Sequence, residues 1–399
     1  MAKSSEAVDL ARWRAETPGC AARVHLNNAG ASLMPAVVKD AITGFLGRES
    51  LEGGYEAADA AAVEVAQVYA AIAALVGARP RNIAIVTSAT HAFAQALSAF
   101  DFAAGDAILT TNADYVSNQL MYLALARRQG VRVVRAPDAP EGGVDVDAFA
   151  GLLARERPRL AAVTWIPTNS GMIQPAEELG RHCREAGVPF LLDACQAVGQ
   201  LPIDVGALQC DYLTTTARKF LRGPRGIGFL VASDAALARG DAPLLLDMRG
   251  ARWTEADTYA LVADARRFEQ WEFPYALVMG LGAAARYALE VGVPRAAQRA
   301  HALAAHARAR ISVLPGVRSL DRGAQLSAIA TFAVEGRSGR DLMLALRGQG
   351  INTSAQSRGD ALIDLDRKGV DSLLRVSPHY FNTEDEVETA ARALDRLLA

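Results

Sequence analysis

Short apolar runs alternate with longer amphipathic stretches through the middle of the chain, and this alternation limits the possible folds more than any other feature. The runs that we predict to be strands lie at 82–87, 106–111, 131–136, 160–166, 189–194, 211–216 and 226–231. The stretches that we predict to be helices lie at 90–100, 116–129, 145–157 and 175–186. LAAVTWI at 160–166 is apolar on both faces, as expected of a strand that helices cover on both sides. We therefore expect an α/β fold with a mainly parallel, seven-stranded sheet.

The pattern changes near residue 276. A long helical region at 276–312 is followed by the strand-like ATFAVEG, a helix at 338–349, a loop at 350–368, and a last strand, LLRVS, with a helix after it. A chain of 399 residues also exceeds the usual size of one hydrophobic core. We expect a large α/β domain at 16–275 and a small α+β domain at 276–399, closely packed, with residues 1–15 on the small domain.

Composition excludes several classes of function. The formal net charge is −2 and there is no basic block, which argues against a nucleic-acid partner. The first residues lack the apolar core of a secretory signal, and the longest apolar stretch, 61–78, contains Glu64 and Gln67, so we interpret it as a packed helix and not as a membrane span. The four cysteines are scattered without a C-x-x-C pair, which disfavours disulfides and a zinc site. We expect a cytoplasmic protein with no metal.

Polar side chains follow three of the predicted strands, where ligands bind in open α/β sheets. In TSAT at 87–90 a strand ends in small hydroxyl residues and continues into a helix, so Ser88, Ala89 and Thr90 can either bind a phosphate or simply cap that helix. In LLDACQ at 191–196, Asp193 follows a strand directly. A buried carboxylate needs a partner such as a pyridinium N–H, although a structural cap is the alternative.

Lys219 lies in TTTARKFLRGPRGIGFL at 214–230, after a strand that ends in hydroxyl residues and before a turn rich in glycine and proline. Burial at the end of a strand lowers the pKa of a lysine and makes its amine a nucleophile. Thr216 lies where it could reach the same phosphate as Thr90. A single lysine in such a turn is more often a solvated surface residue, so the assignment depends on the segments taken together.

Taken together, these segments resemble the fold-type I pyridoxal 5′-phosphate (PLP) enzymes, specifically the group of class V aminotransferases and cysteine desulfurases. That group has a phosphate turn like TSAT, an Asp-x-x-Gln element like DACQ, and a Ser/Thr-x-x-Lys element like TARK followed by GPRGIG. The similarity extends from HLNNAGAS at 25–32 to LLRVSPHYFNTEDEV at 373–387.

The resemblance implies roles for individual residues. Lys219 would hold PLP as a Schiff base and later move protons at the substrate Cα. Asp193 would pair with the pyridine nitrogen, Gln196 and Asn169 would lie near the ring hydroxyl, and Tyr115 would stack on the ring. The residues implied to hold the phosphate are Ser88, Ala89, Thr90 and Thr216.

The resemblance also implies a substrate site and a homodimer. Arg375 matches the arginine that binds the α-carboxylate of an amino-acid substrate, which a guanidinium can hold with two parallel hydrogen bonds. Asn28 and Ala29 would line the mouth of the site, and loops such as 48–56 and 350–360 would form the pocket for the substrate side chain.

An arginine cluster either favours an acidic substrate or consists of solvated or interface arginines: Arg222, Arg225, Arg266 and Arg267.

Two departures from the desulfurases narrow the expected reaction. Arg218 stands where they have a proton-handling histidine, and the segment 350–368 has no cysteine where they present the one that forms a persulfide. Cys195, beside Asp193, is either part of the site or a small packed residue.

In lacking the loop cysteine, the chain resembles the C–S lyases and the isopenicillin N epimerase-like enzymes of the group. The leading hypothesis is therefore a β-eliminating C–S lyase acting on an L-cysteine derivative. An aminotransferase or amino-acid epimerase is the alternative, a cysteine desulfurase is less favoured, and a PLP-binding protein without turnover is a hypothesis of a different class.

Overall fold

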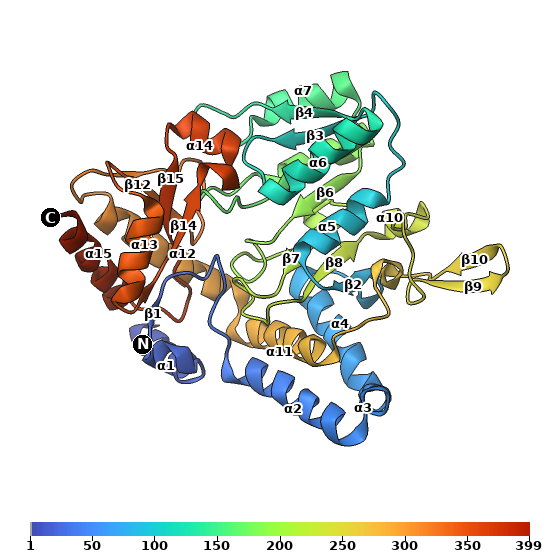
Figure 1. Cartoon of the computed structure of the whole chain (residues 1–399), viewed down its shortest axis with the longest axis horizontal. Helices are drawn as coiled ribbons and strands as arrows, with labels where there is room; N and C mark the ends of the chain where they lie inside the picture. Colours follow the sequence, from blue (N-terminus) through green and yellow to red (C-terminus); the bar gives the residue numbers. More distant parts are fainter. Residues whose placement is uncertain (1) are drawn as a thin grey trace.

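A seven-stranded sheet forms the centre of the molecule in the computed structural model, which describes residues 2–399 (Figure 1). The strands run in the order β2-β8-β7-β6-β5-β3-β4, and all neighbours are parallel except that β8 is antiparallel to both β2 and β7. Their bounds are β2 (Ile83–Val86), β3 (Ala107–Thr111), β4 (Arg132–Ala136), β5 (Leu160–Thr164), β6 (Phe190–Asp193), β7 (Tyr212–Thr216) and β8 (Gly228–Ala232). All seven strands predicted from the sequence are confirmed.

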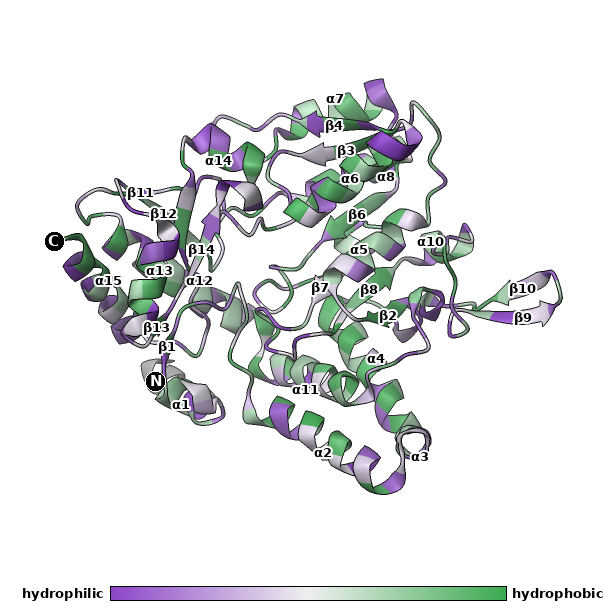
Figure 2. Ribbon diagram, viewed as in Figure 1, coloured by the Kyte–Doolittle hydropathy of each residue, from purple (hydrophilic) through white to green (hydrophobic). Residues whose placement is uncertain are grey.

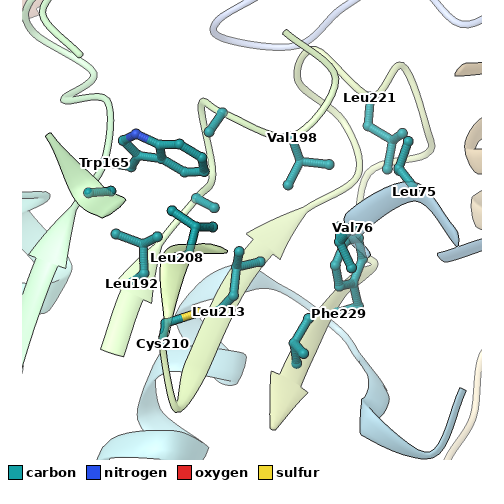
Figure 3. Packing of buried hydrophobic residues seen from close by; sticks show 14 of the residues in the cluster. Leu75, Val76, Trp165, Leu192, Val198, Leu208, Cys210, Leu213, Leu221 and Phe229 are labelled. Atoms are coloured by element: carbon teal, nitrogen blue, oxygen red, sulfur yellow. The ribbon is translucent and has the colours of Figure 1, made fainter. Parts of the chain in front are cut away.

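Helices cover both faces of this sheet because alternate residues of each buried strand point to opposite sides. On β6, for example, Phe190 and Leu192 belong to one apolar cluster and Leu191 to the other. The helices that follow the strands are α5 (Ala89–Ser98), α6 (Val116–Gln129), α7 (Val146–Glu156), α8 (Ala176–Ala186), the short α9 (Val205–Leu208) and α10 (Asp234–Ala238). Figure 3 shows Leu192, Leu213 and Phe229 packed side by side in the first cluster, and Figure 2 shows hydrophobic colouring along the central strands.

Four helices form a layer outside β2 and β8. These are α2 (Ala36–Glu52), α3 (Gly54–Ala60), α4 (Ala62–Val76) and α11 (Tyr275–Val291). Helix α11 packs along both α2 and α4 (Figure 1). Helix α11 ends at Gly292, whose φ of +84° lies in the left-handed region, and α12 (Val293–Ile311) continues from there in a new direction. The predicted helical region at 276–312 is therefore two helices.

A four-stranded antiparallel sheet lies in the C-terminal part of the chain. Its order is β11-β12-β15-β14, and helices α12, α13 and α15 pack against it or each other. The bounds are β11 (Val317–Ser319), β12 (Ala330–Val334), α13 (Gly339–Gly348), β14 (Ser354–Ser357), α14 (Leu362–Lys368), β15 (Ser372–Val376) and α15 (Glu384–Leu398). Residues 2–399 also include four 3₁₀ turns, at Pro18–Ala21, Pro80–Asn82, Ala265–Phe268 and Arg358–Asp360.

The start of the chain lies against this C-terminal part. Strand β1 (Val24–His25) pairs in parallel with β13 (Ile351–Asn352). Helix α1 (Ala2–Ala15) places Trp13 edge-to-face on Tyr380, with ring centroids 5.0 Å apart. The division of the chain at residues 275 and 276, and the assignment of residues 1–15 to the smaller domain, stay predictions.

Two segments predicted as loops are regular structure instead. The segment 350–368 contains β13, β14 and α14, and the segment 48–56 is the end of α2 and the start of α3. The hairpin of β9 (Ala251–Glu255) and β10 (Thr258–Leu261) projects from the molecule (Figure 1). Across residues 2–399, no single helix is long and apolar enough to cross a membrane. Two bent helix pairs, α3–α4 and α11–α12, are long and apolar enough when each pair is taken together.

Candidate active site

A cavity of about 250 Å³ lies at the edge of the sheet where its parallel strands end. Thr164, Asp193 and Thr216 are the last residues of β5, β6 and β7, and they meet at this edge because those strands are parallel. Strand β8 runs the other way, so the residues before it reach the same edge. The cavity is lined by Thr87, Ser88, Ala89, Thr90, Tyr115, Thr164, Ile166, Thr168, Asp193, Cys195, Gln196, Thr216, Arg218, Lys219, Arg225 and Gly226.

Lys219 is presented by a closed loop between β7 and β8. The loop is fixed at its base because Ala217 N–H donates to the carbonyl of Ile227 (3.0 Å), and Gly223 N–H donates to the carbonyl of Ala217 (2.8 Å). Gly199 packs against the other side of the loop. Its φ is +93°, and a Cβ there would lie 2.3 Å from the carbonyl carbon of Phe220. Only glycine meets both conditions at this position.

The amine of Lys219 is buried, with 7% of the residue exposed. Burial lowers the pKa of Lys219, although the nearby Cys195 and the carboxylate of Asp193 act in the opposite direction. A lysine with a lowered pKa has a larger fraction of neutral, nucleophilic amine near pH 7. Nζ lies 6.0 Å from the centroid of the Tyr115 ring, so an aromatic face stands beside the amine.

Asp193 is buried at the end of β6, and the chain binds both of its oxygens. Oδ1 accepts the N–H of Cys195 (2.9 Å), and Oδ2 accepts Nδ2 of Asn118 (3.0 Å). These donors fix the plane of the carboxylate toward the cavity. An ionised carboxylate in this position can bind a protonated ring nitrogen.

A second buried carboxylate, Asp114, stands behind the first and was not identified from the sequence. Asn118 Nδ2 donates to it as well (3.1 Å), so that amide bridges the two carboxylates. Asp114 also accepts the hydroxyl of Thr164 (2.5 Å) and the N–H of Tyr115 (2.7 Å). Burial raises the pKa of Asp114, and the charge of Asp193 adds to the effect. The sequence DYVSN held the signal, because Asp114, the residue before the N-cap of α6, bonds both Tyr115 and Asn118.

The phosphate turn begins α5. Ser88 is the N-cap, and its Oγ accepts the N–H of His91 (3.1 Å). The capping interpretation is therefore correct for Ser88, and it does not exclude anion binding, because the N–H groups of the first turn have no acceptor within the helix. Ala89, Thr90 and Thr216 line the cavity beside it.

Comparison with known proteins identifies the family. The sequence matches the family described as Aminotransferase class-V over residues 24–389. The chain belongs to this family. It is therefore a PLP-dependent enzyme, and the chain's resemblance to the class V aminotransferases and cysteine desulfurases is confirmed.

Relatives within the family carry different names. A cysteine desulfurase of Synechococcus elongatus is 30% identical over 94% of this chain, but the chain spans only 60% of that relative's length. A probable hercynylcysteine sulfoxide lyase of Mycobacterium tuberculosis is 29% identical over 96% of this chain and 92% of its own length. The solved structure of a cysteine desulfurase from Escherichia coli superposes with a TM-score of 0.87 at 25% identity, covering 98% of both chains.

The residues of the class V cavity fit PLP. The donor set offers a buried amine, a carboxylate held open toward the cavity, an aromatic ring and a helix N-terminus with two hydroxyls beside it. Gln196 adds an amide whose Nε2 donates to the carbonyl of Ala29 (3.1 Å) and to Oγ1 of Thr168 (3.1 Å). Its Oε1 is buried and has no hydrogen-bond partner within the described part of the chain. An orphaned polar atom in a cavity indicates a ligand that supplies the missing group.

Arg375 of this class V enzyme lies on β15 behind the cavity lining and contacts it through one residue. Its Nη1 donates to the carbonyl of Thr168 (2.9 Å) and to its hydroxyl (2.6 Å). The guanidinium is buried, and Nε has no hydrogen-bond partner among the described residues. Burial and the charge of Arg218 lower the pKa of Arg375 to about 10.

Three other residues expected in the site do not line the cavity. Asn169 directs its amide at Asp364 on α14. Asn28 is fully buried and donates to the carbonyl of Ser377 (2.8 Å), which ties β1 to β15. Ala29 contributes only the carbonyl that Gln196 binds. The amide nitrogens of Asn169 and Asn28 thus bond residues of the C-terminal part, and the expected contacts of Asn169 with the cofactor ring and of Asn28 with the substrate stay predictions.

The four arginines predicted as a cluster have different surroundings in the fold. Arg222 is fully buried, with its guanidinium carbon 4.3 Å from the centroid of the Phe381 ring. Arg266 pairs with Asp264, and Arg267 donates to backbone carbonyls. Of these four arginines only Arg225 lines the cavity, where it is joined by Arg218.

Cys195 lines the cavity and is the sole cysteine to do so among the residues that the structure describes. Burial raises the pKa of its thiol, and the charge of Asp193 raises it further. The thiol is therefore protonated near neutral pH and a poor nucleophile.

Proposed function

We propose that this enzyme catalyses β-elimination from an L-cysteine derivative, releasing a thiol or related sulfur leaving group. The observation that carries the proposal is that the cavity contains a buried amine with a lowered pKa but no activated thiol. The names of the two relatives described above, a cysteine desulfurase and a hercynylcysteine sulfoxide lyase, both refer to cysteine-derived substrates. These names support a sulfur-containing amino acid as the substrate.

Arg375 would bind the substrate α-carboxylate. Its Nε has no partner among the described residues, and burial together with Arg218 lowers its pKa, so a carboxylate beside it would stabilise its charge. Thr168 holds the guanidinium at one end, so the carboxylate would approach the other end. This contact would place Cα of the substrate between Arg375 and Lys219.

Lys219 would act as the base. Bound PLP supplies an electron sink that stabilises negative charge at Cα, and Asp193 keeps that sink effective by binding the ring nitrogen. Nζ of Lys219 takes the Cα proton, the electron pair of that bond forms the Cα=Cβ double bond, and the Cβ–S bond breaks with both electrons leaving on sulfur. Addition of water then gives pyruvate and ammonia, so the balance is one amino acid and one water to one thiol, one pyruvate and one ammonia.

A persulfide-forming desulfurase needs a thiolate that attacks the substrate sulfur. The segment 350–368 has no cysteine, and Cys183 and Cys210 are buried away from the cavity. Cys195 is in the cavity, but burial and Asp193 raise the pKa of its thiol. These facts favour elimination over desulfuration.

The products decide between the reactions. We expect the PLP-loaded enzyme, incubated with S-conjugates of L-cysteine or with cystine, to form pyruvate and ammonia in equal amounts. Formation of alanine and sulfane sulfur from L-cysteine would instead indicate a desulfurase. Transfer of the amino group to a 2-oxo acid, or conversion to the D-amino acid without pyruvate, would contradict the proposal in favour of an aminotransferase or an epimerase.

We also propose a homodimer. The hairpin β9–β10 and the segment before it expose several large apolar side chains, which supports a protein interface there. These side chains are Leu244, Leu245, Met248, Trp253 and Tyr259, with Trp253 82% exposed and Leu245 81% exposed. We expect light scattering to give twice the mass of the chain, and a monomer at micromolar concentration would contradict this proposal.

A further inference from the structure

The cavity has an excess of positive charge on one side. Arg218 and Arg225 line it together with Lys219, and Arg375 lies directly behind Thr168. Asp193 is the only carboxylate among the lining residues that the structure describes, and its oxygens already accept hydrogen bonds from Asn118 and Cys195. The charge on this side is therefore not neutralised by the chain.

Arg218 lines the cavity and bonds the segment that follows β1. Its Nη1 donates to the carbonyl of Gly30. Arg375 reaches the same segment, with Nη2 3.4 Å from Oδ1 of Asn27. Both guanidinium groups thus lie against the segment 27–30, and both have only neutral hydrogen-bond acceptors there.

Arg225 has no hydrogen bond and no ion pair in the described part of the chain. It stands in the turn before β8, and it is close enough to Arg218 that its charge, after burial, lowers the pKa of Arg218. Arg225 is exposed and Arg218 is half-buried. Two neighbouring guanidinium groups that repel each other are stabilised by an anion placed between them.

The other anions of the reaction have donors of their own. The N-terminus of α5, with Thr90 and Thr216 beside it, is suited to the phosphate. Arg375, with its orphaned Nε, is suited to the α-carboxylate. What is left for Arg218 and Arg225 is the part of the substrate beyond Cβ.

From this arrangement we infer that the preferred substrates carry an anionic oxygen group, such as a carboxylate, on the side chain beyond sulfur, and that Arg218, assisted by Arg225, binds it. This inference rests on the proposed function, because it takes the amino-acid site as given and specifies its side-chain end. Guanidinium groups suit such a group because they form paired, charge-assisted hydrogen bonds with it.

A matched pair of substrates tests the inference. S-Carboxymethyl-L-cysteine and S-carbamoylmethyl-L-cysteine have nearly the same shape and differ by one negative charge. We expect kcat/KM for pyruvate formation to favour the carboxymethyl compound by about 10-fold or more, the range set by a hydrogen bond to a charged group. The dissociation constants of both compounds, measured from the change in the visible absorbance of the bound cofactor, are expected to show the same preference without turnover.

The variant Arg218→Gln is expected to reduce this preference to about 2-fold or less, and Arg225→Gln to reduce it in part. Arg218→Lys keeps the charge and is expected to retain part of the preference, which separates a specific loss from misfolding. Arg181→Gln is the control, because Arg181 lies on α8 in an exposed ion pair with Glu185, outside the cavity lining. The affinity for PLP is measured on every variant.

Equal treatment of the two substrates by the unaltered enzyme would overturn the inference, and so would an unchanged preference in Arg218→Gln. Weaker PLP binding in the arginine variants with the preference unchanged would also overturn it, and would assign these arginines to the phosphate. If no compound gives pyruvate while the binding constants still favour the anionic compound, the proposed elimination fails and the inference stands.

Discussion

The two sides of the cavity differ in how completely the chain binds its own polar groups. On the cofactor side, Asp193, Asp114 and Asn118 form a closed network in which both carboxylates accept hydrogen bonds from neighbouring side chains or backbone. On the cationic side, by which we mean Arg218, Arg225 and Arg375, the guanidinium groups of Arg218 and Arg375 bond neutral acceptors and Arg225 is exposed. The first side is therefore organised before any ligand binds, and the second is free to bind anions.

This difference separates two kinds of specificity. A preorganised network fixes the orientation of a cofactor that stays bound through many turnovers. Unsatisfied cations instead distinguish one substrate from another, because an uncharged analogue leaves them without partners. Changes on the cofactor side should therefore affect all substrates alike, and changes on the cationic side should affect them selectively.

The largest effect is expected from Lys219→Ala, which removes the proposed base and should therefore affect every substrate. We expect pyruvate formation to fall by about 100- to 10,000-fold for every substrate, the range typical of a lost general base. Lys39→Ala on α2, which removes an exposed amine paired with Asp40, serves as the control. A Lys219→Ala enzyme with more than a tenth of the original rate would show that another group removes the proton.

Gly199→Ala should disturb the loop that presents Lys219. The new Cβ would meet the backbone of Phe220 at 2.3 Å and the backbone N of Leu221 at 2.5 Å, and backbone atoms cannot rotate away. We expect the free energy of unfolding to fall by at least about 2 kcal/mol more than in Gly187→Ala. Gly187 also has a positive φ, +67°, but a Cβ there would meet open space. Equal destabilisation in urea titrations of the two variants would contradict the close approach.

Asn118→Ala should weaken the binding of PLP without changing the preference between substrates. It removes the amide that bridges Asp114 and Asp193, and a hydrogen bond to a charged group contributes about 1.5–3 kcal/mol. We expect the dissociation constant of PLP, measured by visible absorbance, to rise by about 10- to 150-fold. The preference between charged and neutral substrates is expected to stay the same. Ser117→Ala on the same helix is the control, and unchanged PLP affinity in Asn118→Ala would show that the bridge has no role in cofactor binding.

His379 lies in the segment after β15, beside the loop of Lys219, and it should make the free energy of unfolding depend on pH. Its Nε2 bonds the carbonyl of Phe220 (2.8 Å), behind Lys219, and it follows β15, which contains Arg375. Burial, together with Arg222, lowers the pKa of His379 to about 3. Below about pH 6.5 the unfolded chain binds a proton that the folded chain does not, so the free energy of unfolding falls as pH falls, by about 1.4 kcal/mol per unit until about pH 3.

We expect His379→Gln to reduce the slope of unfolding free energy against pH by about 1 kcal/mol per unit between pH 6 and 4. His182→Gln on α8 is the control, because that imidazole is partly exposed and far from the loop of Lys219. An unchanged slope in His379→Gln would mean that this imidazole is protonated in the folded enzyme.

The seven strands and the residues directly after them were predictable from the sequence, because strands buried on both faces are continuously apolar and the fold places their ends together. The segment 350–368 was predicted wrongly as a loop, because β13 and β14 are short and carry Asn, Ser and Gln on half-buried edges. The hairpin β9–β10 was missed because its exposed strands have no apolar face to recognise.

Within the site, the position of a residue could be predicted where it ends a strand or closely follows one. Asp193 ends β6, and Lys219 follows the end of β7 by three residues. Asn169 differs because its amide is taken by Asp364, which is nearly 200 residues away along the chain. Arg222 and Arg225 are close in sequence but differ in burial, because Arg222 packs against Phe381 in the core while Arg225 is exposed. Such contacts depend on tertiary packing that no local pattern encodes.

The most direct test of the whole account is to locate the lysine that holds the cofactor. The purified, PLP-loaded enzyme is reduced with borohydride, digested, and analysed by mass spectrometry. We predict that the pyridoxyl group is found on Lys219 and that Lys219→Ala takes up none. A pyridoxyl group on another lysine, or its retention in Lys219→Ala, would contradict the assignment of this cavity as the active site.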